Sequence, residues 1–283
     1  MNIPYYHVDV FTEVPFSGNG LSIFLPPEEL PADRMLRITQ EMRQFESIFV
    51  RPREDGSGVF DARVFTVEEE LNFAGHPSLG AAAQLHDRYR AGEDEARWVF
   101  LFPHKSLPIV TRKTTFGYMA SMNQGEALFG EALPEERGRA ILEALQIDRE
   151  DRDLRYPLQV VSTGLPYLLV PLKRRFTTAR IGAEGLSELL TTVGAKFIAL
   201  VDVEGRSIRT GDNAGRVEDV ATGSLAGPAG AYFVRHGAAE PGEEIGIVQG
   251  VHLGRESHLY VTVGNEVHVR GGVVLLAEGQ LRG

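Results

Sequence analysis

The amino-acid sequence predicts an α+β fold built from two similarly organised halves. Short β-branched or aromatic runs bounded by Gly, Pro, Asn or Asp outnumber the helical segments, so strands dominate. Two helical segments, residues 79–85 and 225–234, are small or apolar all the way round and must be buried on every side. Each follows a turn that combines glycine with a hydroxyl residue. We place the boundary after Thr115, which gives halves 1–115 and 116–283, with the last strand able to return to the first half.

The strands are predicted from local composition, and one of them also from alternation. In 257–263, Leu259 and Val261 point to one face while His258 and Tyr260 point to the other, as expected for a half-buried strand. The predicted strands of the first half are 5–11, 21–25, 47–50, 59–67 and 98–102. Those of the second half are 158–162, 167–172, 196–203, 244–248, 259–263 and 267–276.

The remaining helices are amphipathic. Residues 32–42, 135–145 and 184–193 each place apolar side chains on one side, which suits a helix on the surface of a sheet. The two apolar helices differ because their small residues allow strands to approach closely. We therefore expect a sheet to wrap around each of them.

Composition excludes several classes of protein. The 283 residues carry a formal net charge of −10 without a basic run, which argues against a nucleic-acid partner. There is no cysteine, so disulfides, zinc–thiolate sites and thiol nucleophiles are excluded. The apolar runs are far shorter than the roughly 20 residues of a membrane helix. The N-terminus lacks the features of a signal peptide, and we expect a cytoplasmic protein without a membrane partner.

The starts of the two apolar helices are candidate anion sites. The first N–H groups of a helix lack intrahelical acceptors and carry partial positive charge, so two such ends facing one cleft would hold a carboxylate. Pro77 suits the first turn, where its missing N–H is harmless. Ser78, Thr222 and Ser224 can donate to a ligand, or they can simply be N-caps.

A carboxylate in apolar company is the candidate acid–base group. Glu46 is flanked by Phe45, Ile48 and Phe49, and desolvation of such a glutamate would raise its pKa from about 4.3 towards neutrality. A carboxyl group with that pKa can both take and give a proton near pH 7. The alternative is that Glu46 points to solvent from a strand edge, and the residues alone leave both open.

Three histidines of the second half, His252, His258 and His268, carry no companion carboxylate at ligand spacing. A solvated strand face is the simpler interpretation, and we predict no metal site.

The order and spacing of several short motifs resemble the PhzF-like family of phenazine-biosynthesis isomerases over essentially the whole chain. These motifs are Val8-Asp9-Val10-Phe11-Thr12, Pro15-Phe16-Ser17-Gly18-Asn19, Phe45-Glu46-Ser47, Phe73-Ala74-Gly75-His76, Leu79-Gly80-Ala81-Ala82, Glu218-Asp219-x-Ala221-Thr222-Gly223-Ser224, and Gln249-Gly250 followed by Gly254-Arg255.

The resemblance implies the diaminopimelate epimerase fold, with two pseudo-symmetric halves that each wrap a sheet around a central helix and with the active site between them. Related epimerases use a cysteine in each helix-entry turn, whereas PhzF-like isomerases use the glutamate matched by Glu46. The family's other polar site residues match His76, Asp219 and Ser224. In this interpretation Asp219 and His76 assist or orient. The substrate is held at the helix-entry turns, for which we name Gly75, Ser78, Thr222, Gly223 and Ser224.

The implied reaction is a proton and double-bond shift in a small, cyclic carboxylate, resembling trans-2,3-dihydro-3-hydroxyanthranilate isomerisation. It requires no metal and no organic cofactor. One carboxylate can remove the proton from one carbon and return it to another. Two alternatives stay open: an epimerase of a small amino or hydroxy acid, and a catalytically silent protein that binds a small carboxylate. A homodimer is a further expectation.

The sequence also departs from the family pattern at several positions. Pro77-Ser78 replaces a small residue and Thr, Val220 replaces a Pro, and Gly20 stands where a Pro commonly follows the Asn. Pro228 falls early in the second apolar helix, where we expect it to perturb the first turn.

Overall fold

The computed structural model describes residues 2–53, 57–72 and 74–282, so Phe73 of the motif quoted above lies outside the described residues. The chain divides into two compact units. Unit 1 comprises Met1–Asn123 and Arg270–Gly283, and unit 2 comprises Gln124–Val269. The division falls later than the expected boundary after Thr115, because the strand that follows this residue pairs back onto the strand before it.

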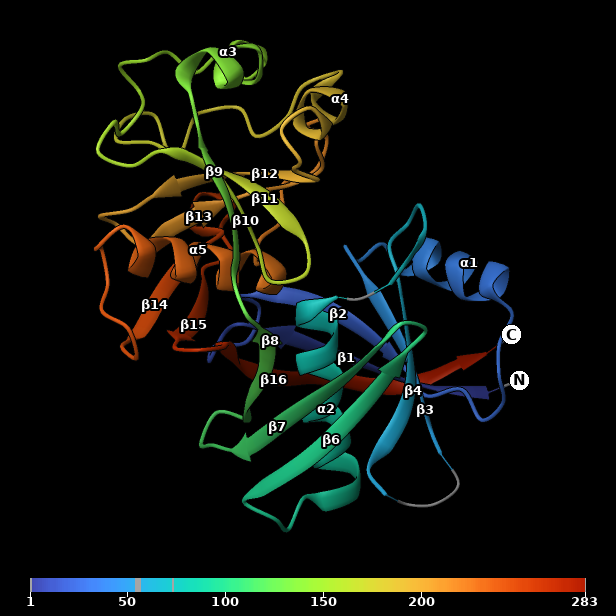
Figure 1. The fold of residues 1–283 in the computed structure, drawn as a ribbon. Helices are drawn as coiled ribbons and strands as arrows, with labels where there is room; N and C mark the ends of the chain where they lie inside the picture. Colours follow the sequence, from blue (N-terminus) through green and yellow to red (C-terminus); the bar gives the residue numbers. More distant parts are fainter. Residues whose placement is uncertain (1, 54–56, 73, 283) are drawn as a thin grey trace. The chain divides into compact units, whose positions relative to one another are not determined.

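Unit 1 is an eight-stranded closed sheet with one helix inside and one outside (Figure 1). The strand order is β1-β2-β3-β4-β6-β7-β8-β16, and antiparallel pairing of β1 with β16 closes it. The two-residue strand β5 pairs with β4 beside this path. The elements are β1 (Asn2–Val10), β2 (Asn19–Phe24), α1 (Ala32–Met42), β3 (Ser47–Pro52), β4 (Val59–Phe65), β5 (Glu70–Leu71), α2 (Gly75–Arg90), β6 (Glu95–Phe102), β7 (Lys105–Lys113), β8 (Tyr118–Gly125) and β16 (Val267–Arg282).

The inner helix α2 is the first of the two apolar helices. Every residue from Gly75 to His86 is buried, and the helix packs against β1, β2, β3, β6 and β7. Gly80 shows why small residues are needed, since a Cβ there would lie 2.6 Å from Leu21 Cδ2 and 2.8 Å from Val10 Cγ2. Such a contact would require the strands to move apart. The expected wrapping of a sheet around this helix is confirmed.

Unit 2 is a second, open sheet with its own buried helix. Its strands follow the order β15-β14-β13-β12-β11-β10-β9, and the start of β16 pairs with β15. Helices α3 and α4 cover an apolar cluster on β10, β11 and β12. The elements are β9 (Leu128–Leu133), α3 (Glu135–Ala144), β10 (Leu158–Ser162), β11 (Pro166–Pro171), α4 (Leu186–Thr191), β12 (Phe197–Asp202), β13 (Ser207–Arg209), α5 (Gly223–Arg235), β14 (Glu244–Gln249), the 3₁₀ turn η1 (Val251–Leu253) and β15 (Ser257–Val263).

Helix α5 is the second apolar helix, and it packs against β10, β11, β14 and β15. A Cβ on Gly230 would lie 2.6 Å from Val261 Cγ1, so this helix also depends on a missing side chain where a strand crosses it. Pro228 lies inside α5 without ending it, because the helix continues to Arg235. Its missing N–H leaves the carbonyl of Ser224 without the usual intrahelical donor. The mixed α+β class and the two sheet-wrapped helices are therefore confirmed.

The membrane expectation can be compared with the helices themselves. Within residues 2–53, 57–72 and 74–282, none of the helices has both the length and the apolar character needed to cross a bilayer.

Candidate functional site

Glu46 and His76 lie together in unit 1. Glu46 immediately precedes β3, and His76 is the second residue of α2. The distance from His76 Nδ1 to Glu46 Oε2 is 3.4 Å, and the two side chains are 4% and 10% exposed. The alternative in which Glu46 points to solvent is therefore wrong, because its carboxylate is buried beside an imidazole.

His76 is a neutral histidine at neutral pH. Burial lowers its pKa from 6.5 to about 3, since the charged imidazolium would lose its hydration. Its Nε2 atom is buried, and it has no hydrogen-bond partner among the described residues. A buried nitrogen of this kind is costly to leave unpaired, which marks it as an atom that a ligand could contact.

The start of α2 has no side-chain cap in the described part of the chain. Its N-cap is Ala74, and the Ser78 hydroxyl donates instead to the Ala74 carbonyl, at 2.7 Å. This bond uses the only hydrogen of the Ser78 hydroxyl inside the helix. The backbone N–H groups of Gly75 and His76 lie in the first turn, where a helix supplies no acceptor. A ligand anion at this turn would meet backbone donors rather than Ser78.

Asp219 and Thr222 lie together in unit 2, directly before α5. The Thr222 hydroxyl donates to Asp219 Oδ2 at 2.5 Å, and the N–H of Ala221 donates to Oδ1 at 3.4 Å. Asp219 is 5% exposed, so this carboxylate is buried within hydrogen bonds. Thr222 is the N-cap residue of α5, yet its side chain does not cap the helix. Its expected role as a donor to a substrate stays a prediction, and here the hydroxyl hydrogen serves Asp219.

The first turn of α5 contains Gly223 and Ser224, as the sequence predicts. The Ser224 hydroxyl lies 2.8 Å from the Tyr167 hydroxyl, and either oxygen can be the donor. Gln124 donates to the Gly223 carbonyl at 2.8 Å and accepts from the Thr163 hydroxyl at 2.8 Å. This turn is therefore fixed by side chains of unit 2, while Ser224 retains a hydroxyl that can reorient toward a ligand.

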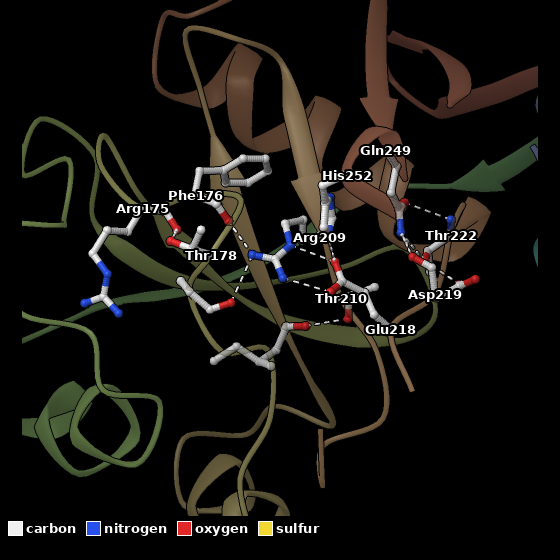
Figure 2. A network of polar contacts seen from close by, with 12 residues as sticks. Arg175, Phe176, Thr178, Arg209, Thr210, Glu218, Asp219, Thr222, Gln249 and His252 are labelled. Atoms are coloured by element: carbon white, nitrogen blue, oxygen red, sulfur yellow. Dashed lines mark hydrogen bonds and ion pairs between the residues drawn. The ribbon is translucent and has the colours of Figure 1, made fainter. Parts of the chain in front are cut away.

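A polar network surrounds Asp219 (Figure 2). Glu218 and Gln249 belong to the motifs quoted above, whereas Arg209 was not identified from the sequence. Gln249 bonds to both Asp219 and Thr222. On the preceding residue, the Glu218 carboxylate accepts two hydrogen bonds from Arg209, at 2.7 and 2.8 Å. Arg209 is 5% exposed and also donates to the Phe176 and Ala179 carbonyls.

His252 belongs to the same network, which corrects its predicted position. It lies in the turn η1 rather than on a strand face, and its Nε2 is 2.9 Å from Glu218 Oε1. Its neighbour Gly250 supplies a positive φ of 78° that turns the chain there. The sequence contained one signal for this region, the Gln249-Gly250 pair. Nothing in the pattern of residues around this pair indicated which residues it contacts.

Each predicted residue therefore falls into one of two groups. Glu46, Gly75, His76 and Ser78 lie around the start of α2 in unit 1, and Asp219, Thr222, Gly223 and Ser224 lie around the start of α5 in unit 2. Each group contains one buried carboxylate and the uncapped start of one buried helix.

Comparison with known proteins places the chain in one family. A model of the family described as phenazine biosynthesis-like protein (PhzC-PhzF) matches residues 8–279. A trans-2,3-dihydro-3-hydroxyanthranilate isomerase from Pseudomonas chlororaphis is 32% identical, with 90% of this chain and 88% of the relative covered.

Two solved structures are similar over nearly the whole chain. One from Pseudomonas aeruginosa, described as a predicted epimerase, is 45% identical, covers 99% of both chains and gives a TM-score of 0.93. A PhzF-family phenazine biosynthesis protein from Bacillus anthracis is 23% identical, covers 100% of this chain and 99% of its own, and gives a TM-score of 0.84. The second likeness shows the fold alone.

Proposed function

Since the chain belongs to the phenazine biosynthesis-like (PhzC-PhzF) family and is an isomerase, we propose that it shifts a proton, and with it a double bond, within a small carboxylate. The observation that carries the proposal is the buried Glu46 carboxylate beside the neutral imidazole of His76. A desolvated carboxylate is a stronger base than one in water, and its conjugate acid is still able to return the proton.

The proposed step balances without any further reactant. Glu46 removes a proton from one carbon, and the electron pair of that C–H bond forms a new double bond to the middle carbon. The π electrons of the original double bond move onto the third carbon, where they form the new C–H bond. Protonated Glu46 then delivers to that carbon either the proton it removed or one that has exchanged with solvent. The product has the formula of the substrate, as an isomerisation requires.

His76 supports this chemistry by staying uncharged. A positive charge 3.4 Å from Glu46 would stabilise the carboxylate and weaken it as a base. Burial keeps the imidazole neutral at working pH, so that it can orient Glu46 or the substrate by hydrogen bonding. Nδ1 faces Glu46, and the buried Nε2 is the atom we assign to contact with the substrate.

We propose that each helix start, that of α2 in unit 1 and that of α5 in unit 2, can bind a carboxylate. The first-turn N–H groups of Gly75, His76, Gly223 and Ser224 are the donors, and the hydroxyl of Ser224 is a further one. Binding a carboxylate through backbone N–H groups requires no positive side chain beside Glu46. A cation there would lower the pKa of the base.

The substrate is proposed by class. A cyclic carboxylate related to trans-2,3-dihydro-3-hydroxyanthranilate is the first to test, since that compound is named for the relatives. The enzyme would be incubated with cyclic and amino carboxylates in deuterated water. A solvent-derived or relocated hydrogen at a new carbon, detected by ¹H NMR, supports the isomerase.

An epimerase is the second candidate. It is favoured by the second buried carboxylate, Asp219, and by the relative of 45% identity that is described as an epimerase. An epimerase would exchange hydrogen at one carbon and invert the configuration of that carbon, without moving a double bond. A protein that only binds carboxylates would exchange no carbon-bound hydrogen with any of the compounds.

A further inference from the structure

Hydrogen bonds from several residues fix the segment from Glu218 to Thr222 (Figure 2). Arg209 binds the Glu218 carboxylate, and the N–H of Asp219 donates to the Thr210 carbonyl at 3.0 Å. On the other side lies Gln249, the last residue of β14, which is 2% exposed. A Cβ on the adjacent Gly250 would lie 2.6 Å from the Val220 carbonyl oxygen, so this turn also fits closely against the segment.

The orientation of the Gln249 carboxamide is fixed by two backbone groups. Its Oε1 accepts from the N–H of Thr222 at 2.9 Å, and its Nε2 donates to the carbonyl of Asp219 at 2.7 Å. Rotating the carboxamide by 180° would place a donor against the N–H and an acceptor against the carbonyl. Backbone groups cannot exchange these roles, so only the observed orientation is bonded.

The direction of the Thr222 hydroxyl follows from this orientation. The second hydrogen of Gln249 Nε2 points to Thr222 Oγ1 at 3.0 Å, so the hydroxyl oxygen is the acceptor there. A hydroxyl group has one hydrogen, and it is directed to Asp219 Oδ2 at 2.5 Å. The donor order is therefore Gln249 to Thr222 to Asp219.

We infer that Gln249 is a positioning residue that, through Thr222, makes Oδ2 of Asp219 a permanent hydrogen-bond acceptor and so favours the ionised form of Asp219. A hydrogen bond from a fixed donor stabilises the ionised carboxyl group. A proton on Oδ2 would face the Thr222 hydrogen, so protonation of this oxygen would break the bond.

The same arrangement accounts for the missing cap of α5. An N-cap threonine ordinarily accepts a hydrogen bond from an N–H of the first turn. Here the Thr222 hydroxyl is occupied by Gln249 and Asp219, and no side-chain cap is formed. Gln249 thus orients a carboxylate and at the same time keeps the helix start uncapped. The use of Asp219 in a reaction rests on the proposed function, but its titration does not.

The experiment is a pH titration of the Asp219 carboxyl carbon by ¹³C NMR in the ligand-free protein. Thr222→Val removes the donor and should raise the apparent pKa of Asp219 by about one unit or more, because a hydrogen bond to the charged form is lost. Gln249→Met frees the hydroxyl to rotate and should raise the pKa by a smaller amount. Thr222→Ser keeps the hydroxyl and should restore the wild-type value.

The control is Gln159→Met. Gln159 is another buried glutamine of unit 2; it donates to the Gly130 carbonyl and bonds to His236, and it lies outside the network. The Gln159→Met variant should leave the Asp219 titration unchanged. Equal Asp219 titrations in wild type, Thr222→Val and Thr222→Ser would overturn the inference, and this comparison does not require the Gln249 variant to fold.

The outcome is separable from that of the proposed function. The titration uses neither substrate nor turnover, so it can succeed in a protein that never exchanges deuterium. Conversely, loss of exchange in a Glu46 variant would stand even if Asp219 titrated identically in every network variant.

Discussion

His76 Nδ1 lies 3.4 Å from Glu46 Oε2, although the two residues are 30 positions apart in the sequence and come from different elements. The contact joins the residue before β3 to the first turn of α2. A buried carboxylate next to a neutral imidazole is suited to moving a proton, because burial makes the carboxylate a stronger base and an uncharged imidazole does not stabilise its negative charge.

We expect His76 to make the protein less stable in acid. Its pKa is about 3 when folded and about 6.5 when unfolded, so the unfolded state binds more protons between these values. The free energy of unfolding should therefore rise with pH up to about 6.5, by about 1.4 kcal/mol per pH unit from this residue. Its full contribution is present above pH 6.5 and is lost as the pH falls.

Urea unfolding at several pH values measures this slope. His76→Gln should flatten the acid side of the profile relative to wild type. His258→Gln, which removes an imidazole whose side chain is 43% exposed, serves as the control. The explanation fails if wild type and His76→Gln lose stability in parallel between pH 6.5 and 5.

Ala82→Asp should destabilise unit 1 by several kcal/mol. Ala82 is fully buried in α2, and an aspartate there would be an unpaired charge in a packed helix–sheet contact. Ala140→Asp is the matched control, because Ala140 is an exposed residue inside α3. That change should cost about 0.5 kcal/mol. Similar unfolding midpoints for the two variants would contradict the burial of α2.

Two serines at the helix starts should differ in their effect on carboxylate binding. Ser224 keeps a hydroxyl shared with Tyr167, whereas Ser78 uses its hydrogen inside α2. Ser224→Ala should weaken binding of anthranilate, a probe carboxylate, by about 2- to 10-fold. Ser78→Ala should change it little. Calorimetric titration checks both, and the reverse order would show that Ser78 is the donor to the ligand.

The sequence predicted the central helices well, and the reason is physical. A helix without a polar face has no stable place at a surface, so 79–85 and 225–234 could be assigned to the interior without any knowledge of topology. Their starts were predicted less well. Gly75, His76 and Ser78 are helical in the structure. The sequence did not predict this, because a first turn with Gly and Pro carries little helical periodicity.

Several strands were missed because alternation was absent or obscured. β9 is mostly exposed on both faces and so shows no period of two. β7 contains Pro108 and lysines at both ends, which are typical of turns or edges. The contact between Glu46 and His76 could not be predicted from spacing either. It depends on the pairing of β3 within the sheet around α2, and only the family resemblance connected the two residues.

Gln249 illustrates the limit for the site. The Gln249-Gly250 motif contributed to the family resemblance but did not indicate a contact. The importance of Gln249 arises from its hydrogen bonds to two backbone groups 27 and 30 residues earlier in the chain. Such a contact is set by tertiary structure, so a sequence pattern does not reveal it.

The most direct measurement is the rate of hydrogen exchange between substrate carbon and deuterated water in wild type and Glu46→Gln. The variant keeps the shape of the side chain and removes its proton chemistry, so exchange should fall by about 10²–10⁴-fold while anthranilate affinity changes much less. Glu41→Gln, an exposed change at the end of α1 in the same unit, should exchange at the wild-type rate. Wild-type exchange by Glu46→Gln on an accepted substrate would contradict the proton-shuttle role and make Asp219 the better candidate.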